Sequence, residues 1–286
     1  MNTKNIRYLM KFLPDDVYLK ICYRLKMHKK LNLKNPKTFN EKLQWLKLYN
    51  RKPEYTMMVD KYKVREYVKE KIGEEYLIPL VGGPYYNVDE INLDKLPDQF
   101  VLKCNHDSGS VITCKDKKSF DFEAAKRKLD YCLKHNFWYL GREWPYKDVK
   151  PCIIAEKYMV DESEKELKDY KVFNFNGEPK IIQVDIGRFT HHKRNLYDKN
   201  WRYMSLSIQY PTDAKTEISK PEKLDEMLEI AKKLSKDIPF LRTDFYSIGN
   251  KIFFGEITFS HGSGFEEFRP NEWDRMLGDL IDIRGI

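Results

Sequence analysis

The stretch LRTDFYSIGNKIFFGEITF, residues 241–259, consists of two β-rich runs that meet at Gly249-Asn250. Aromatic and β-branched residues on both sides of a Gly-Asn pair are typical of a β-hairpin. A second stretch, KDYKVFNFNGEPKIIQVDIGR at residues 168–188, has the same pattern and turns at an Asn-Gly pair. Hairpins mixed with helical segments indicate an α+β fold with largely antiparallel sheets, and not a doubly wound parallel sheet.

Four polar residues of the 241–259 hairpin can act together. Arg242 and Asp244 lie two apart on the first strand, so their side chains share a face. Glu256 and Thr258 are related in the same way on the second strand. If both pairs face inward, the two carboxylates suit Mg²⁺ beside phosphate oxygens, and the guanidinium can brace a transferring phosphoryl group. The alternative is an amphipathic hairpin with a charged outer face, but charges among such apolar neighbours are costly unless used.

Two loops of small, polar residues are candidate binding sites for anions. The first, FSHGSGF at residues 259–265, follows the hairpin and could hold an acceptor substrate or a phosphate; the alternative is a surface turn. The second follows Lys103, which lies inside a short predicted strand, and contains Ser108, Gly109 and Ser110. An ammonium and loop N–H groups suit phosphate binding, although neither a Walker A motif nor GxGxxG is present. The alternative is a strand-edge lysine before a loop.

The segment IIAEKYM, residues 153–159, is a short apolar strand that ends in charged and aromatic residues. Its apolar side chains could cover a purine ring, and Glu156 could bind a ribose hydroxyl or the adenine amino group. The alternative is a core strand that meets solvent. Lys61 and Lys171 are further candidate phosphate ligands, although each, taken separately, has the pattern of a surface lysine.

The N-terminal part of the chain is predicted to be helical, because apolar residues recur at helical spacing in VYLKICYRLKMHKK and FNEKLQWLKLY. Thr38 and Glu41 have the pattern of a capping box at the start of the second helix. The first helix carries five basic residues near Leu19, Ile21 and Leu25 and could lie on an anionic membrane surface. The alternative is that this helix packs on the main body of the protein.

The composition limits the class of protein. The chain has 286 residues with 41% hydrophobic content, enough for a sizeable core and more than one lobe. It has no run near the roughly 20 apolar residues that a membrane span needs, and no secretory signal is predicted. The net charge of +8 suggests anionic partners, although the basic residues are scattered among acidic ones. Five cysteines without CxxC spacing indicate a reduced, cytosolic protein, and the six histidines show no zinc pattern.

Taken together in this order, the segments resemble the ATP-grasp superfamily and, more closely, its TupA-like branch, which is named after a teichuronopeptide biosynthesis protein. The resemblance runs over almost the whole chain. PKTFNEKLQWLKLYNRKPEYTMMVDKYKVREYV at residues 36–68 and EEYLIPLVGG at residues 74–83 resemble the front section of that branch. FVLKCNHDSGS resembles its phosphate loop, IIAEKYM its adenine hinge, and RTDFY with GEITFSHGSGF its metal hairpin.

The resemblance implies an ATP site. Lys61 and Lys103 would contact the α- and β-phosphates, and Lys171 would be a further neighbour of the phosphates. Glu156 would hold the adenosine. The remaining implied contacts come from a loop that folds over the phosphates and from backbone groups that read the adenine edge, namely Ser108, Gly109, Ser110, Lys157 and Tyr158.

The resemblance also implies a magnesium site. Asp244 and Glu256 would bind Mg²⁺, and Arg242, together with Lys103, would stabilise the transferred phosphoryl group. The third metal ligand of the family is commonly an Asn two residues after the Glu, and this chain has Thr258 there. A hydroxyl can ligate Mg²⁺ or hold a bound water, so Thr258 is the candidate third ligand.

The fold implied by the resemblance is an α+β ATP-grasp fold, with two α+β lobes of mainly antiparallel sheet and a helical N-terminal extension. We expect the helical region at residues 1–75 and the catalytic region at residues 76–286. Within the catalytic region, residues 76–155 would form the phosphate-loop lobe. Residues 156–286 would contain the hinge, the metal hairpin and the C-terminal lobe.

The implied function is an ATP- and Mg²⁺-dependent carboxylate–amine ligase. A substrate carboxylate would attack the γ-phosphate to give an acyl phosphate, and an amine would then displace the phosphate. The expected substrate is an amino acid or a uronic acid, as a small molecule or a precursor of a surface polysaccharide or capsule. We expect a cytoplasmic protein with peripheral contact at the inner face of the membrane, no nucleic-acid partner and no obligate protein partner.

Three alternatives to the ligase stay open. The first is a kinase on the same fold that phosphorylates a sugar hydroxyl. The second is a glycosyltransferase of a polysaccharide pathway, which commonly carries a DxD metal motif that this chain lacks. The third is a basic binding module for nucleic acid or an acidic polymer, which predicts strongly salt-dependent binding that is indifferent to Mg-ATP.

Overall fold

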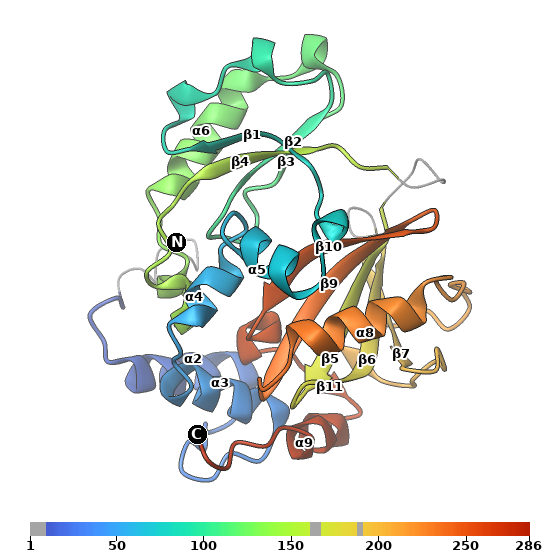
Figure 1. Cartoon of the computed structure of the whole chain (residues 1–286). Helices are drawn as coiled ribbons and strands as arrows, with labels where there is room; N and C mark the ends of the chain where they lie inside the picture. The colour runs from blue at the N-terminus through green and yellow to red at the C-terminus, as the bar shows by residue number, and fades with distance from the viewer. Residues whose placement is uncertain (1–9, 161–166, 188–190) are drawn as a thin grey trace. The chain divides into compact units, whose positions relative to one another are not determined.

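A computed structural model describes residues 10–160, 167–187 and 191–286 of the chain (Figure 1). The protein is α+β, and every strand pairing in its two larger sheets is antiparallel. The predicted fold class, with mainly antiparallel sheets, is therefore confirmed. Within these three ranges, no helix combines the length and the apolar character needed to cross a lipid bilayer.

The chain divides into two compact units. The middle unit consists of Lys52–Met159, and the terminal unit consists of Met1–Arg51 together with Val160–Ile286. The helices near the N-terminus are therefore shared between the units, because those before residue 52 join the terminal unit and the next ones join the middle unit.

The middle unit contains a four-stranded sheet in the order β1-β4-β2-β3. Its strands are β1 (Leu80–Tyr85), β2 (Phe100–Cys104), β3 (Ile112–Cys114) and β4 (Ile153–Lys157). Its helices are α4 (Glu54–Val59), α5 (Val64–Lys71), α6 (Phe122–Leu133) and α7 (Trp138–Gly141).

One face of the four-stranded sheet is apolar and belongs to the core. Phe100, Leu102 and Cys104 alternate along β2 and pack in one buried cluster with Leu129 of α6. Figure 1 shows α6 lying along this sheet. Because successive side chains of a strand point to opposite faces, Lys103 lies on the face that the core does not use.

The terminal unit contains a five-stranded sheet in the order β10-β9-β5-β6-β7 and a small sheet of β11 and β8. The strands are β5 (Asp169–Phe175), β6 (Glu178–Ile186), β7 (Lys193–Asp198), β8 (Ser207–Ile208), β9 (Phe240–Ile248), β10 (Lys251–Thr258) and β11 (Phe268–Arg269). The helices are α2 (Asp15–Met27), α3 (Phe39–Tyr49), α8 (Leu224–Leu234) and α9 (Glu272–Asp279). Both predicted hairpins are present, as β5–β6 and β9–β10. Helix α8 packs on one face of the larger sheet (Figure 1).

The other face of the five-stranded sheet has a charged half and an aromatic half. Along β5, Asp169 and Lys171 are followed at alternate positions by Phe173 and Phe175. Phe39 of α3 packs against Phe175, with the ring centroids 6.1 Å apart. Helix α3 therefore closes the aromatic half of this face, and the charged half carries the candidate site.

Helix α2 buries one face and exposes the other. Tyr18, Leu19 and Cys22 are buried in a cluster that includes Phe265 of the segment after β10. Ile21 and Leu25 lie on the outer side, where Leu25 is 66% exposed. The Leu19 side of the helix thus packs on the rest of the terminal unit, as the alternative in the sequence analysis predicted. Membrane contact by the outer side stays a prediction.

Candidate functional site

The β9–β10 hairpin brings four predicted residues onto one face. Glu256 pairs with Asp244, and Thr258 pairs with Arg242, across the two strands. A register shift after residue 254 creates a bulge at Gly255. A Cβ at this glycine would lie 3.1 Å from the carbonyl oxygen of Asp244, which is tighter than an ordinary contact. A bulge re-aims the side chains that follow it, and here it turns Glu256 toward the face of Asp244.

Arg242 is the centre of this group. Its Nε and Nη2 donate to the two carboxylate oxygens of Asp244, both at 2.7 Å. Nη2 also donates to Glu256 at 3.1 Å, and Nη1 lies 2.9 Å from Nδ1 of His261. Burial works to lower the pKa of Arg242, but Asp244 and Glu256 outweigh it and raise the pKa further above its usual range. The guanidinium is therefore a fixed, permanent positive charge.

Asp244 is a buried carboxylate with a raised pKa. It is only 3% exposed, and burial raises its pKa to about 6, against the opposing charges of Arg242 and Lys171. The neighbouring carboxylates of Asp169 and Glu256 raise it as well. A cation that contacts Asp244 and Glu256 would relieve this repulsion.

Lys171 lies in the middle of the charged half. It is 5% exposed and pairs with Asp169 on its own strand. Its Nζ also lies 3.5 Å from Asp185 and 3.6 Å from Asp244. Burial works to raise the pKa of Asp185, but Arg194 and Lys171 outweigh it and hold the pKa below its usual range. One ammonium thus links three strands of the sheet.

The ion pairs of the charged half join carboxylates and cations from several strands and from the segment after β10. Within residues 167–187 and 191–286, five carboxylates and three cations take part in these ion pairs. The carboxylates are Asp169, Asp185, Asp244, Glu256 and Glu266, and the cations are Lys171, Arg194 and Arg242.

The donor set fits a hard cation that brings most of its own ligands. Asp244 and Glu256 supply carboxylate oxygens on one face, with the hydroxyl of Thr258 on the same strand as Glu256. The Glu256 side chain is 35% exposed, so a ligand can reach it. In the described residues, no cluster of three or more His, Cys, Asp or Glu side chains has the geometry of a metal site. Mg²⁺ fits this pattern, because it binds through one or two carboxylates and completes its shell with phosphates and water.

In the middle unit, Lys103 and Glu156 form an ion pair on the sheet face opposite the core. Nζ of Lys103 lies 2.6 Å from Oε2 of Glu156, and the side chains are 12% and 10% exposed. Lys103 of β2 pairs with Ile154 of β4, so Glu156 is its diagonal neighbour on the same face. The lysine is therefore held in one orientation along the strand.

The loop between β2 and β3 is closed by its own polar groups. The hydroxyl of Ser110 accepts from the N–H of Cys104 at 2.8 Å and donates to Asp107 at 2.5 Å. Nζ of Lys61 donates to the backbone carbonyl of Asp107 at 2.5 Å. The backbone N–H of Lys61 donates to the carbonyl of Asn105 at 3.0 Å. The structure thus brings Lys61 to the base of this loop.

The tip of the same loop is open to solvent. Ser108 and Gly109 are exposed, whereas Ser110 is buried inside the loop. Gly109 has φ 121°, a conformation that favours glycine. The backbone of the tip, rather than the hydroxyl of Ser110, is therefore the part of the loop that can meet a ligand.

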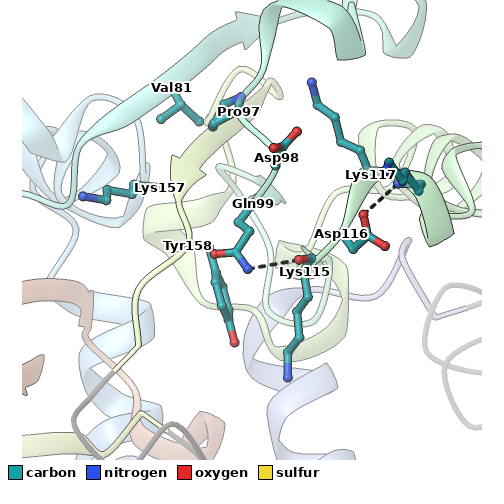
Figure 2. Close-up of a pocket in the computed structure, with 10 residues that line it drawn as sticks. Val81, Pro97, Asp98, Gln99, Lys115, Asp116, Lys117, Lys157 and Tyr158 are labelled. Carbon is teal, nitrogen blue, oxygen red and sulfur yellow. Dashed lines mark hydrogen bonds between the residues drawn. The ribbon is translucent and has the colours of Figure 1, made fainter.

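Lys157 and Tyr158 line an open pocket of about 770 Å³ at the far end of the same sheet. The Phe100 end of β2 pairs with Lys157, whereas the loop follows the Cys104 end. Figure 2 shows Gln99 donating to the carbonyl of Lys115 beside Tyr158, and Lys157 extending away from them. The pocket and the loop thus lie at opposite ends of β2.

The predicted residues form two groups, one in each compact unit. Lys61, Lys103, Glu156 and the residues of the loop and pocket belong to the middle unit, and Lys171 and the hairpin residues belong to the terminal unit.

The charged half also contains residues that sequence reasoning missed, namely Asp169, Asp185, Arg194 and Glu266. Alternation along the strand is a signal for Asp169, which lies two residues from Lys171, but nothing local points to Glu266.

Comparison with known proteins gives one family and several distant structures. A family model described as TupA-like ATPgrasp matches residues 41–282, a range that includes both groups of site residues. The D-alanine–D-alanine ligase from Bacillus anthracis is 19% identical over 71% of this chain and 57% of its own, with a TM-score of 0.38. The same enzyme from Helicobacter pylori is 18% identical over 79% and 63%, with a TM-score of 0.40.

A third similar structure is an N5-carboxyaminoimidazole synthase from Aspergillus clavatus. It is 12% identical over 72% of this chain and 45% of its own, with a TM-score of 0.42. The chain thus spans between 45% and 63% of the length of these three proteins. No curated protein matches its sequence.

Proposed function

Because the chain belongs to the TupA-like ATP-grasp family, we propose that it is an ATP-dependent ligase that joins a carboxylate to an amine. The observation that carries this proposal is the arrangement around Arg242. A buried guanidinium lies between two carboxylates on one sheet face, with Lys171 3.6 Å from the first of them. Such an arrangement suits the stabilisation of charge on a transferring phosphoryl group.

ATP and Mg²⁺ are the proposed cofactors. Asp244 and Glu256 would hold Mg²⁺, which supplies electrostatic stabilisation of the phosphate oxygens, and Thr258 would contribute its hydroxyl or hold a bound water. Lys61 and Lys103 would contact the phosphates, and the exposed backbone of Ser108 and Gly109 would close over them. Glu156 would bind the ribose or the adenine amino group near the strand end at Lys157 and Tyr158.

In the proposed reaction, a substrate carboxylate oxygen forms a bond to the γ-phosphorus as the bond to ADP breaks. The attacking nitrogen of an amine then bonds to the acyl carbon, phosphate leaves, and the nitrogen loses a proton. Arg242 would stabilise the charge on the transferred oxygens, and the ion pairs around it would keep it in place. The substrate we propose is an amino acid or uronic acid of a surface-polysaccharide precursor, and not a nucleic acid.

Ligand-dependent stabilisation tests this proposal. A ligand that binds the folded state raises the melting temperature by mass action. MgATP should therefore raise the melting temperature of the wild type. The share of this rise that depends on Mg²⁺ should be lost in Asp244→Asn and Glu256→Gln. Asp225→Asn is the matched control, because its side chain is 91% exposed on α8.

Three outcomes would contradict the ligase. The metal assignment fails if both variants keep the full Mg²⁺-dependent stabilisation. The nucleotide assignment fails if UDP-sugars stabilise the wild type and ATP does not. A phosphorylated product that persists in the presence of amine, with no amide formed, would identify a kinase instead.

We further propose that the outer side of α2 makes peripheral contact with an anionic membrane surface. Residues 10–30 contain six basic and two acidic residues, which is half of the net charge of the chain. Phe12 is 84% exposed and Leu25 is 66% exposed in the same segment. Apolar side chains beside basic ones are the combination that binds to anionic lipids.

A further inference from the structure

Seven side chains of the terminal unit form a closed ring of contacts, which we name the charged ring. No gap between neighbours exceeds 3.6 Å, and six of the seven residues are buried. In order around the ring, the members are Arg242, His261, Glu266, Arg194, Asp185, Lys171 and Asp244. His261 is the one member of this ring that needs no charge to make its contacts.

The contacts of His261 define which ring nitrogen carries the proton. Nη1 of Arg242 lies 2.9 Å from Nδ1, and a guanidinium can only donate, so Nδ1 must accept. The proton is then on Nε2, which lies 2.7 Å from Oε2 of Glu266. Burial lowers the pKa of His261 although Glu266 opposes the shift, which agrees with a neutral imidazole.

Glu266 holds this imidazole in place. Nη1 of Arg194 donates to the same carboxylate at 3.0 Å, so its position is defined by two partners. Burial works to raise the pKa of Glu266, but His261 and Arg194 outweigh it and lower the pKa to about 2. The imidazole also packs on the ring of Phe173, with centroids 4.7 Å apart. The contact with Arg242 and the packing on Phe173 therefore limit rotation of the imidazole.

Helix α3 fixes the backbone that follows His261. Gln44 donates to the carbonyl of Gly264 at 2.6 Å, and Lys47 donates to that of Ser263 at 2.7 Å. Both side chains are buried, and Ser263 has a positive φ of 55°. The residue that carries the imidazole thus leads into a turn with little freedom to move.

His261 differs from the other partners of Arg242 in one respect. Asp244 and Glu256 are the proposed metal ligands, so a bound cation competes with Arg242 for their oxygens. His261 contacts the guanidinium through a neutral nitrogen that is not among the proposed ligands. It can therefore keep Arg242 oriented while the two carboxylates bind metal.

We propose that His261 is a positioning residue for Arg242, which holds the guanidinium toward the γ-phosphate of bound MgATP by accepting a hydrogen bond from Nη1. This inference rests on the proposed function, because it requires Arg242 to contact the γ-phosphate. It concerns only the part of nucleotide binding that distinguishes ATP from ADP.

The test compares MgATP with MgADP by titration calorimetry. Its readout is the ratio of the Kd for MgADP to the Kd for MgATP, which reports contacts to the γ-phosphate. His261→Leu should lower this ratio about tenfold, the effect of losing one hydrogen bond to a charged group, and change the Kd for MgADP less than about twofold. His261→Asn, whose amide oxygen can take the place of Nδ1, should restore most of the ratio. His191→Leu changes an exposed histidine of the same unit and should leave the ratio unchanged.

A double variant separates positioning from a direct role. If His261 acts through Arg242, then His261→Leu should have no further effect on the ratio in an Arg242→Met background. Equal effects in both backgrounds would overturn the inference, as would an unchanged ratio in His261→Leu. Where His261→Leu fails to fold, His261→Gln replaces it, because its amide reaches the position of Nε2 and not that of Nδ1. A wild type that binds neither nucleotide would refute the proposed function itself, before any variant is compared.

Discussion

Replacing Lys171 by methionine tests how far the charged half of the sheet depends on this cation. The side chain is 5% exposed and pairs with three carboxylates, those of Asp169, Asp185 and Asp244. Methionine keeps most of the volume and removes the charge. Removing one partner from a buried ion pair costs about 3–5 kcal/mol, because the charges that remain are uncompensated. The free energy of unfolding of Lys171→Met should therefore fall by about 3–5 kcal/mol at pH 7.

Urea unfolding followed by tryptophan fluorescence measures this change. Lys220→Met is the matched control, because the Lys220 side chain is 50% exposed and lies 3.8 Å from an exposed carboxylate. Exposed ion pairs contribute about 0–1 kcal/mol, so the control should change little. A loss below about 1 kcal/mol in Lys171→Met would refute the reasoning, since the carboxylates would then not depend on the ammonium.

The pH dependence gives an independent check of the same reasoning. Against the effect of its burial, the charges of Arg194 and Lys171 lower the pKa of Asp185 in the folded protein. A carboxylate with a lowered folded pKa stabilises the fold above its unfolded pKa of about 3.9, and this contribution is lost as the pH falls toward the folded value. Asp244, which also contacts Lys171, has a pKa of about 6, so the stability difference between wild type and Lys171→Met should begin to narrow near pH 6 and should narrow further below about pH 4. A difference that is constant down to low pH would show that its origin is packing.

Two further predictions concern other parts of the chain. Ser110→Ala removes a buried hydroxyl that bonds to Cys104 and Asp107, so thermal unfolding should show a loss of about 1–3 kcal/mol, whereas the exposed Ser108→Ala should show almost none. Equal losses would contradict the closed-loop geometry. Leu25→Glu should reduce co-sedimentation with vesicles that contain phosphatidylserine. Equal binding to purely zwitterionic vesicles, or no effect of the change, would argue against membrane contact.

Local signals in the sequence were sufficient to predict turns, helix caps and strands wherever the stabilising interactions lie within a few residues of one another. Asn176 and Gly177 both have positive φ, as a two-residue hairpin turn of type I′ requires. Thr38 and Glu41 form the capping box that their spacing predicts. The strand predicted at Phe100–Cys104 is β2 with the same bounds.

Local signals in the sequence do not decide on which face of the sheet the Glu256 side chain lies. A regular ladder that continues the pairing at the hairpin turn would put Glu256 opposite Thr243, on the other face from Asp244. The bulge at Gly255 shifts the register by one residue, so Glu256 pairs with Asp244 instead. Period-two alternation places side chains within each strand, but the bulge depends on the packing of both strands.

The amino-acid sequence alone determined which chemical groups are present, which strands carry them and that those strands form antiparallel hairpins. Only the tertiary structure decided that Arg194 and Glu266, 72 positions apart, share an ion pair and that His261 lies between Glu266 and Arg242. The reason is that turns and caps depend on neighbours along the chain. A buried charged ring instead depends on which strands and loops the packed sheet brings together, and on the burial that makes each of its contacts strong.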